Sequence, residues 1–405
     1  MTESDSRDRD VALVLSGGGI NGVLLELGFL KRVRETTLWP RVGWIYGTSA
    51  GALSGAMAAL DRLDDLEQFL VELQPGEVFR PRRVWQFPGG LHDYTLPETI
   101  AARLGDGAQL GETLVAAEIE LVVFATDVSA HLEGDETRHF ELVYSSRDTP
   151  ADTLSGALLA SAAISALVLP VVVNGVIATD GSWVRNFPLG HAYRNSGVRG
   201  IVGFRYVASY RPTDLTLLER MRERLDRFRA VPPVRALLAE IRLAEERVER
   251  GEPAHYAELI VRLMRVAIAQ NTVLEERLAS ERASSAAELR RLRADVISTA
   301  VDAAPRRRQQ HLRARLDELF DEARFPFGHD RSLPTLIVRG AHGDVGLDPS
   351  FRGDEPWPVE RKRALIERGY RLTDEALASG ADGLDDLLVD EEVGRGPGRR
   401  SDPMP

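Results

Sequence analysis

The chain has 405 residues, of which 43% are hydrophobic, so it is long enough to bury a large core and to carry an added region beside it. Its formal net charge of −11 makes the chain as a whole a poor electrostatic match to nucleic acid or to an anionic membrane, which only a local basic patch could offset. The absence of cysteine excludes disulfides, thiolate metal sites and cysteine nucleophiles.

Residues 1–9 form a polar, charged stretch with no apolar segment of signal-peptide type. No run in the sequence approaches the about 18 consecutive apolar residues that a membrane-spanning helix needs. We therefore expect a cytoplasmic protein without a transmembrane segment, either free in solution or peripheral to a membrane.

The first predicted strand covers 11–15 and runs into a cluster of glycines, after which apolar periodicity predicts a helix over 23–34. The cluster contains the G-x-G-x-x-G pattern of a dinucleotide-binding turn, which would suit a nucleotide-binding oxidoreductase. That pattern expects an acidic residue at the end of the second strand, whereas Glu35 lies before that strand. The other interpretations are an oxyanion hole, in which closely spaced amides stabilise a negative oxygen, and a tight turn without chemistry. The glycines are Gly17, Gly18, Gly19 and Gly22.

The second predicted strand, around 42–46, ends directly in Gly47-Thr48-Ser49-Ala50-Gly51, and a helix is predicted over 52–60. Strand, G-x-S-x-G and helix in this order are the sequence form of a nucleophile elbow. The turn is so tight that its glycine positions must lack side chains, and the serine hydroxyl faces substrate at a helix N-terminus, where negative charge is favoured. Ser49 is therefore the candidate nucleophile, and an oxyanion hole becomes the better explanation of the glycine cluster.

The stretch 79–88 has few periodic signals and places arginines beside Trp85 and Phe87. Such a stretch could hold an anionic headgroup at an interface. The more frequent alternative is a solvated loop whose aromatic side chains pack on the core.

Strands and helices alternate up to residue 206, which predicts an α/β layer fold with its site at the C-terminal ends of the strands. The further predicted elements are strands over 120–127, 140–144 and 200–206, a helix around 151–164, and a hairpin at Asn174-Gly175.

Asp180 ends the second strand of this hairpin and is followed by Gly181, so its carboxylate is placed to reach a cleft, although Asp-Gly is also a common turn dipeptide. A serine nucleophile needs such a group to take its proton. No histidine stands in a motif that marks a member of a Ser-His-Asp triad. The eight histidines are His92, His131, His139, His191, His255, His311, His329 and His342.

The glycine cluster, the serine elbow and Asp180-Gly181 resemble, in the same order, the three motifs of patatin-like phospholipases, a family of lipid acyl hydrolases. The resemblance covers about residues 10–210 and returns around 365–370. It implies a three-layer α/β fold with a central, mostly parallel sheet.

The resemblance also implies a Ser-Asp dyad, in which Ser49 attacks an ester carbonyl and Asp180 accepts the serine proton. The expected function is a serine acyl hydrolase of the phospholipase A, lysophospholipase or esterase type, which acts on lipid esters at a membrane or micelle surface. No metal or organic cofactor is implied. The amides of Gly17, Gly18 and Gly19 would hold the oxyanion, and the motifs would be supported by Gly22, Gly47, Gly51 and Gly181.

Two positions depart from the family pattern. Asn21 stands where Arg or Lys is usual, which removes a positive charge near the expected oxyanion hole and could change substrate preference. Ser182 stands where Gly or Ala is usual and is a tolerated small residue. Asn21 is the one residue that favours the alternative function, a catalytically weak lipid-binding or regulatory module that acts through a helical insertion.

That insertion is predicted over 212–330, between a catalytic core at 10–211 and a return to the core at 331–379, because glycine nearly disappears and helical periodicity is strong. Prolines and a glycine divide it into several helices. The most apolar helix, 256–269, could be a lid or a membrane or partner contact, although a core helix of the insertion is the more frequent case. A strand at 336–338 and a helix at 358–370 return the chain to the core, and 380–405 is expected to be a disordered tail.

Overall fold

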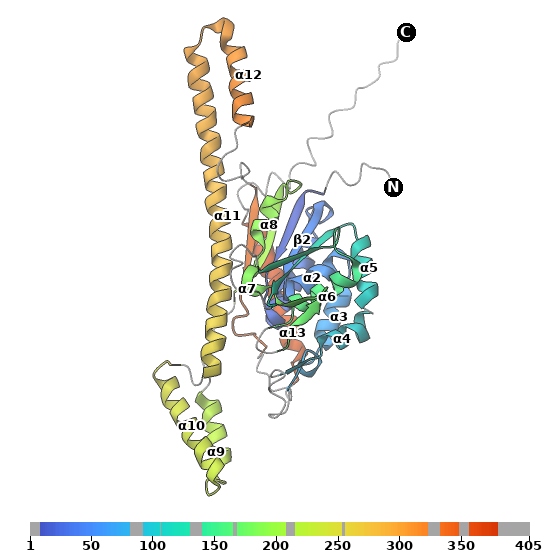
Figure 1. Ribbon diagram of the computed structural model, residues 1–405, viewed down its shortest axis with the longest axis vertical. Coiled ribbons are helices and arrows are strands. Elements are labelled where there is room, and N and C mark those ends of the chain that lie inside the picture. The colour runs from blue at the N-terminus through green and yellow to red at the C-terminus, as the bar shows by residue number, and fades with distance from the viewer. Residues whose placement is uncertain are drawn as a thin grey trace.

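The computed structural model describes residues 9–81, 92–105, 107–129, 140–164, 168–207, 215–252, 256–322, 333–347 and 356–379. An α/β body is flanked on one side by long helices from the segment 215–322 (Figure 1). The predicted polar stretch before Arg9, most of the predicted interfacial stretch (after Pro81) and the predicted tail from 380 lie outside the described residues.

The body is built on a single large sheet, whose strands follow the order β10-β9-β1-β2-β5-β8-β7, with β6 also paired to β5. These strands are β1 (Val11–Leu15), β2 (Val42–Thr48), β5 (Glu120–Asp127), β6 (Glu141–Ser145), β7 (Val171–Val173), β8 (Val176–Asp180), β9 (Gly200–Tyr206) and β10 (Thr335–Gly340). The five strands from β10 to β5 are parallel, whereas β6, β7 and β8 pair antiparallel. The C-terminal ends of β1, β2 and β9 therefore meet at one edge of the sheet. A separate two-stranded ribbon pairs β3 (Phe79–Pro81) with β4 (His92–Tyr94).

Both faces of the sheet are covered, which explains why its central strands read as continuous apolar runs. In β1, Leu13 and Leu15 belong to the hydrophobic cluster on one face, and Ala12 and Val14 belong to the cluster on the other face. Every residue of β1 is buried.

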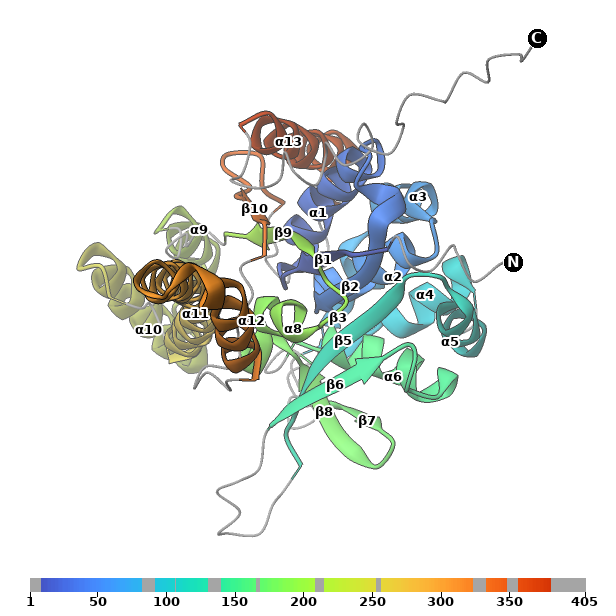
Figure 2. The ribbon, with the colours of Figure 1, turned by 90° about the horizontal axis from the view of Figure 1, so that it is seen from above.

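The layer on the first face contains most of the helices of the body, and the layer on the second face is thinner (Figure 2). The first layer consists of α1 (Gly19–Arg34), α2 (Ala50–Ala59), α3 (Leu63–Glu72), α4 (Leu96–Leu104), α5 (Gly107–Ala116), α6 (Ala151–Ser161) and α13 (Val359–Ala378). The short helices α7 (Ser182–Arg185) and α8 (Leu189–Arg194) lie on the side of the second face, where α8 packs against the sheet. Two 3₁₀ turns lie at Trp39–Arg41 and Pro75–Glu77. This is a three-layer α/β fold with a mostly parallel sheet, and the predicted fold class is confirmed.

The helices beside the body are α9 (Leu215–Asp226), α10 (Pro232–Glu249), α11 (Tyr256–Ala303) and α12 (Arg306–Glu322). The 48 residues of α11 make it about 72 Å long at 1.5 Å per residue, so it runs past the whole body (Figure 1). Ala279 of α11 joins the hydrophobic cluster of the second face. Within the described part of the chain, no helix combines the length and the apolar character needed to cross a membrane.

Of the two interpretations of 256–269, the side chains that are described there fit an exposed contact segment better than a core helix. This segment is the beginning of α11, and Leu259, Leu263 and Val266 are all exposed, Val266 to 65%. These apolar side chains lie on the part of α11 that the body does not cover.

Candidate active site

Ser49 occupies the turn between β2 and α2 with a strained backbone, φ 56° and ψ −120°. Non-glycine residues rarely adopt a positive φ, and such strain is concentrated at functional sites. The glycines on either side of the turn are required by close approach, because a Cβ added to Gly47 would lie 2.4 Å from the carbonyl oxygen of Gly51. The sequence pattern therefore builds the predicted elbow.

The structure brings Ser49 and Asp180 together, 131 positions apart in the chain. The hydroxyl of Ser49 donates a hydrogen bond of 2.6 Å to Oδ2 of Asp180, and both side chains are buried. The other carboxylate oxygen, Oδ1, accepts a bond of 2.8 Å from the amide of Ser182. Thr126 donates to the carbonyl oxygen of Asp180 at 2.8 Å, and the amide of Asp180 donates to the carbonyl of Ala163 at 3.0 Å. The carboxylate is thus held in one orientation toward the serine.

Burial raises the pKa of Asp180, while the hydrogen bonds from Ser49 and Ser182 lower it by a smaller amount. A carboxylate with a raised pKa is a stronger base than an exposed one. This environment suits the removal of a proton from a serine hydroxyl. Tyr94 lies near the same carboxylate: burial raises the pKa of its phenol first, and the charge of Asp180 raises it further.

A further residue at this site, Ser161 at the end of α6, has a role that the sequence reasoning missed. Its buried hydroxyl accepts a hydrogen bond of 2.8 Å from the amide of Ser49 and donates one of 2.6 Å to the carbonyl of Phe124. It therefore ties the backbone of the nucleophile to β5. Only its position in a small-residue stretch before the Asp motif hinted at this contact.

The glycine loop passes directly beside the serine. A Cβ on Gly17 would lie 3.2 Å from Cβ of Ser49 and only 2.5 Å from Oγ of Ser182, so a larger residue there would force the Ser182 side chain to move. The amide of Gly17 donates to the carbonyl of Asn186 at 3.1 Å and is therefore already engaged. Of the three amides that were expected to hold an oxyanion, those of Gly18 and Gly19 remain as candidates. Neither amide donates a hydrogen bond to an acceptor among the described residues.

The remaining glycines of the predicted motifs differ in how tightly they are held. Gly51 and Gly181 are packed against backbone, since an added Cβ would lie 2.7 Å from the carbonyl oxygen of Leu15 and 2.2 Å from that of Phe124. At Gly22 an added Cβ would meet the ring of Tyr206 at an ordinary 3.5 Å.

Asn21, the departure from the family pattern, is buried and bound to the returning C-terminal segment. Its Nδ2 donates to the carbonyl of Leu347 at 3.1 Å, and its Oδ1 accepts from the amide of Leu347 at 2.8 Å. A side-chain amide matches a backbone peptide group in this two-bond arrangement, which neither Arg nor Lys could do because they have no acceptor. Asn21 therefore joins the glycine loop to residues 333–347.

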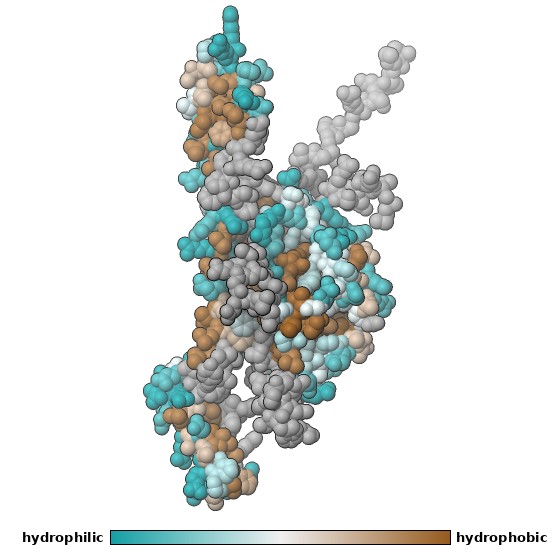
Figure 3. Space-filling model, viewed as in Figure 1, coloured by the Kyte–Doolittle hydropathy of each residue, from teal (hydrophilic) through white to brown (hydrophobic). Residues whose placement is uncertain are grey.

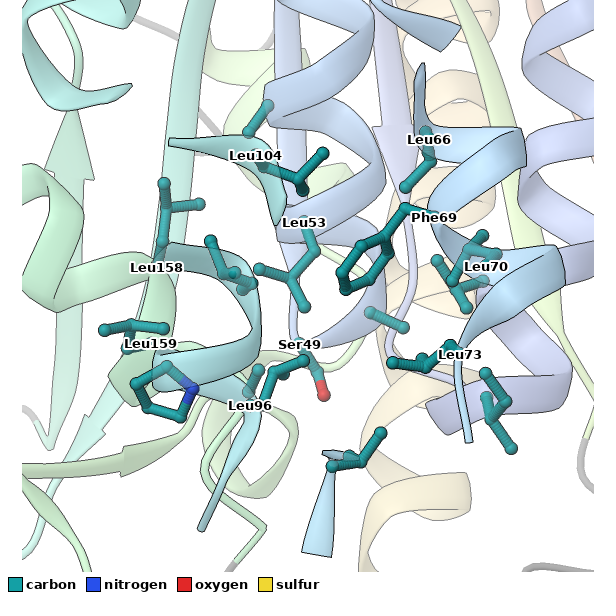
Figure 4. Close-up of a pocket in the computed structure, with 18 of the residues that line it drawn as sticks. Ser49, Leu53, Leu66, Phe69, Leu70, Leu73, Leu96, Leu104, Leu158 and Leu159 are labelled. Atoms are coloured by element: carbon teal, nitrogen blue, oxygen red, sulfur yellow. The ribbon is translucent and has the colours of Figure 1, made fainter. Parts of the chain in front are cut away.

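An apolar cavity of about 210 Å³ opens beside the nucleophile. Ser49, Leu53 and Met57 line it at intervals of about one helical turn along α2, and α1, α3, α4, α5 and α6 supply most of the rest. Figure 4 shows the Ser49 hydroxyl among surrounding leucine and phenylalanine side chains, and the labelled lining residues are Leu53, Leu66, Phe69, Leu70, Leu73, Leu96, Leu104, Leu158 and Leu159. Sequence reasoning missed this cavity because its walls come from helices that are far apart in the chain.

A network of charged side chains lies just behind the Asp180 segment. Arg185 on α7 forms ion pairs with Glu141 of β6 and with Glu275 of α11, and His191 bonds to Glu141 at 3.0 Å. Burial acts to raise the pKa of Glu141, but the hydrogen bonds and charges of His191 and Arg185 outweigh it and lower this pKa to about 2. His191 is thus engaged in this network.

Residues 13–193 match the family model described as "Patatin-like phospholipase". An uncharacterised protein of Acanthamoeba polyphaga mimivirus is 24% identical over 185 residues, which are 44% of this chain and 59% of that protein, so the match spans less than two thirds of the relative's length.

The crystal structure of VipD from Legionella pneumophila covers 92% of this chain and 67% of its own, with 13% identity and a TM-score of 0.37. A likeness at that score is too distant to assign any property. The family model thus identifies residues 13–193 as a domain similar to patatin-like phospholipases, and this match covers less than half of the chain.

Proposed function

We propose that this protein is a serine acyl hydrolase that cleaves lipid carboxylic esters through a dyad of Ser49 and Asp180. The observation that carries the proposal is the 2.6 Å hydrogen bond from the Ser49 hydroxyl to Oδ2 of Asp180 at the wall of an apolar cavity. The nucleophile, its base and a site for an acyl chain are thereby next to one another.

In the first half of the reaction, Oδ2 of Asp180 takes the proton of Ser49 as the serine oxygen attacks the ester carbonyl. The carbonyl oxygen becomes an oxyanion, which the amides of Gly18 and Gly19 stabilise at the N-terminus of α1. The tetrahedral intermediate collapses, the bond to the alcohol oxygen breaks, and Asp180 returns the proton to that oxygen. An acyl-enzyme remains on Ser49.

In the second half, Asp180 takes a proton from water as the water attacks the acyl carbonyl. The bond to the serine oxygen then breaks, Ser49 recovers its proton from Asp180, and the fatty acid is released. The same two amides stabilise the second oxyanion, and removal of one such donor typically lowers the rate by roughly 100- to 1,000-fold.

The cavity favours an acyl chain over a small acid. From Ala50 to Met57 the lining follows α2 for about 10 Å, at 1.5 Å per residue. An extended hydrocarbon advances about 1.25 Å per carbon, given an ordinary C–C bond and a tetrahedral angle, so roughly eight carbons fit along this face.

The proposal is tested by hydrolysis of a nitrophenyl ester and of phospholipid vesicles by the wild type, Ser49→Ala and Asp180→Asn. We expect turnover by the wild type and a loss of at least about 1,000-fold in both variants, because each removes a member of a unit that acts together. Ser155→Ala is the matched control, since this serine also lines the cavity but does not contact the dyad in any recorded bond. Circular dichroism establishes that every variant is folded. Retained activity in Ser49→Ala would sink the proposal.

The alternative function, a catalytically weak lipid-binding module, is not favoured by a specific observation. Asn21 was the residue that suggested it, and the paired hydrogen bonds with Leu347 give that residue a structural role.

A further inference from the structure

The α9–α10 hairpin leaves the sheet at the same edge as the candidate active site. The glycine loop follows β1, the elbow follows β2, and α9 follows β9, and these three strands are parallel. Figure 1 shows the hairpin extending beyond the α/β body, with the turn between α9 and α10 at one extremity of the molecule. The turn is therefore carried outward on the side where substrate would enter.

The two helices of the hairpin hold each other together. Leu218, Ile241 and Ala244 form a small hydrophobic cluster, with Leu225 and Val248 packed against it. This cluster uses the inner faces of α9 and α10. The apolar residues around the turn are not part of it and need another explanation.

We define the hairpin tip as residues 227–239, which connect α9 to the first turns of α10. Phe228 is 50% exposed, and Val231 and Leu237 are each 46% exposed. Arg227, Arg229 and Arg235 lie among them and are exposed as well, and the guanidinium of Arg227 lies over the ring of Phe228. The tip contains three basic residues and no acidic one, in a chain whose net charge is −11, although Arg229 lies 3.9 Å from Asp226 at the end of α9.

Apolar side chains alternating with arginines on a protruding turn are suited to the boundary of a bilayer, because the rings and methyl groups enter the acyl region while the guanidinium groups stay at the headgroups. The surface of the hairpin shows hydrophobic and hydrophilic residues side by side (Figure 3). The basic tip also supplies the local positive patch that an otherwise acidic chain needs at an anionic surface.

We propose that the hairpin tip docks the protein onto anionic lipid surfaces, with Phe228, Val231 and Leu237 in the interface and the three arginines at the headgroups. The choice of a lipid surface as partner rests on the proposed hydrolysis of lipid esters. Docking through the tip brings the sheet edge that carries Ser49 toward the membrane that supplies the substrate.

The first test places a reporter at the tip. The chain has no cysteine, so Val231→Cys carries a single environment-sensitive dye without background labelling. The matched control is Gln310→Cys, an exposed position on α12 at the opposite end of the helices. With vesicles of phosphatidylcholine and phosphatidylserine, we expect a blue shift and a gain in intensity at position 231 and no change at position 310. No change at 231, or an equal change at both positions, overturns the proposal.

The second test removes charge at two ends of the molecule. Arg227→Gln, Arg229→Gln and Arg235→Gln together remove three positive charges from the tip, and Arg306→Gln, Arg307→Gln and Arg308→Gln remove the same number from exposed positions on α12. A basic residue near an anionic membrane contributes about fivefold to binding, so we expect vesicle affinity to fall about 100-fold in the tip variant and less than about threefold in the control. Unchanged affinity in the tip variant overturns the proposal and would indicate that another class of partner covers the tip.

Both tests are made in the Ser49→Ala background, so that binding is read without hydrolysis. They separate the two proposals. If the protein binds vesicles through the tip but hydrolyses no ester, the proposed function fails and the proposed docking surface stands. If the protein hydrolyses dispersed nitrophenyl esters but does not bind vesicles through the tip, the proposed function stands and the proposed docking surface fails.

Discussion

At the residue scale, the hydroxyl of Ser49 lies 2.6 Å from the buried carboxylate of Asp180 and beside the glycine loop that follows β1. Ser49, Asp180 and the glycine loop are recognisable because the strained elbow and the close backbone approaches permit few residue types. Ser161 and Leu347 could not be assigned from sequence, because their contacts with Ser49 and Asn21 join segments more than 100 positions apart. For the same reason the engagement of the Gly17 amide by Asn186 was not predictable.

Glu26 gives a second example of a buried group that pattern reasoning does not reveal. It is fully buried in α1, Oε2 accepts a bond of 3.0 Å from the hydroxyl of Ser54, and Oε1 has no recorded partner among the described residues. Burial raises the pKa of Glu26 well above its ordinary value, and the bond from Ser54 offsets this only in part. The folded protein therefore holds a proton that the unfolded chain releases more easily.

This protonation makes stability depend on pH in a defined direction. Below the pKa of Glu26 in the unfolded chain, both states are protonated and the free energy of unfolding does not depend on this group. Above that pKa the unfolded chain ionises first. The free energy of unfolding then falls by about 1.4 kcal/mol per pH unit until the pH reaches the pKa of the folded state. Glu26→Gln keeps a neutral side chain of the same shape. We expect denaturant unfolding to show equal stability of wild type and variant at pH 4 and a more stable variant at pH 8. The exposed Glu98→Gln is the control, and the same pH dependence in both variants would contradict the assignment.

At the scale of elements, most strands and helices follow from the sequence, and their assembly does not. The alternating pattern up to Tyr206 and the positive-φ turn at Asn174-Gly175 give the strands and the hairpin as predicted. α11 fills the stretch between the predicted helix breaks at Gly251-Glu252-Pro253 and Pro305, and the apolar segment 256–269 is only its first part. The cavity was missed because the six helices from α1 to α6 must pack together before it exists.

The cavity wall formed by α2 predicts chain-length selection. Met57 lines it about 12 Å along the helix from Ser49, at 1.5 Å per residue. Met57→Trp fills this end, and each methylene that loses its apolar contact costs about 0.8 kcal/mol, or about fourfold in kcat/KM. We expect nitrophenyl octanoate hydrolysis to fall at least about tenfold relative to nitrophenyl butyrate.

Met57→Ala makes the opposite change, because it enlarges this end of the cavity. We expect the preferred acyl chain of the substrate to stay the same length or to become longer. The butyrate ester serves as the internal control, because a short acyl group does not reach Met57. If Met57→Trp lowers the rates of both esters by the same factor, the acyl chain does not follow this face of α2.

At the scale of the whole molecule, the net charge of the chain is negative, whereas the hairpin tip is positively charged. The net charge of −11 argues against nucleic-acid binding as a first hypothesis, but it averages over a surface on which Arg227, Arg229 and Arg235 lie close together in the sequence. Only the structure shows that this segment protrudes at the edge of the sheet where the nucleophile lies. Composition alone could not have located it.

The most direct test of the central claim is to identify the residue that becomes acylated. The wild type is incubated with a fluorophosphonate that carries an eight-carbon chain, and the modified peptide is sequenced by mass spectrometry. We predict one adduct, on Ser49, that forms at least about 100-fold more slowly in Asp180→Asn because the serine has lost its base. An adduct on another residue, or equal labelling of Asp180→Asn, would contradict the assignment of Ser49 and Asp180 as a catalytic dyad.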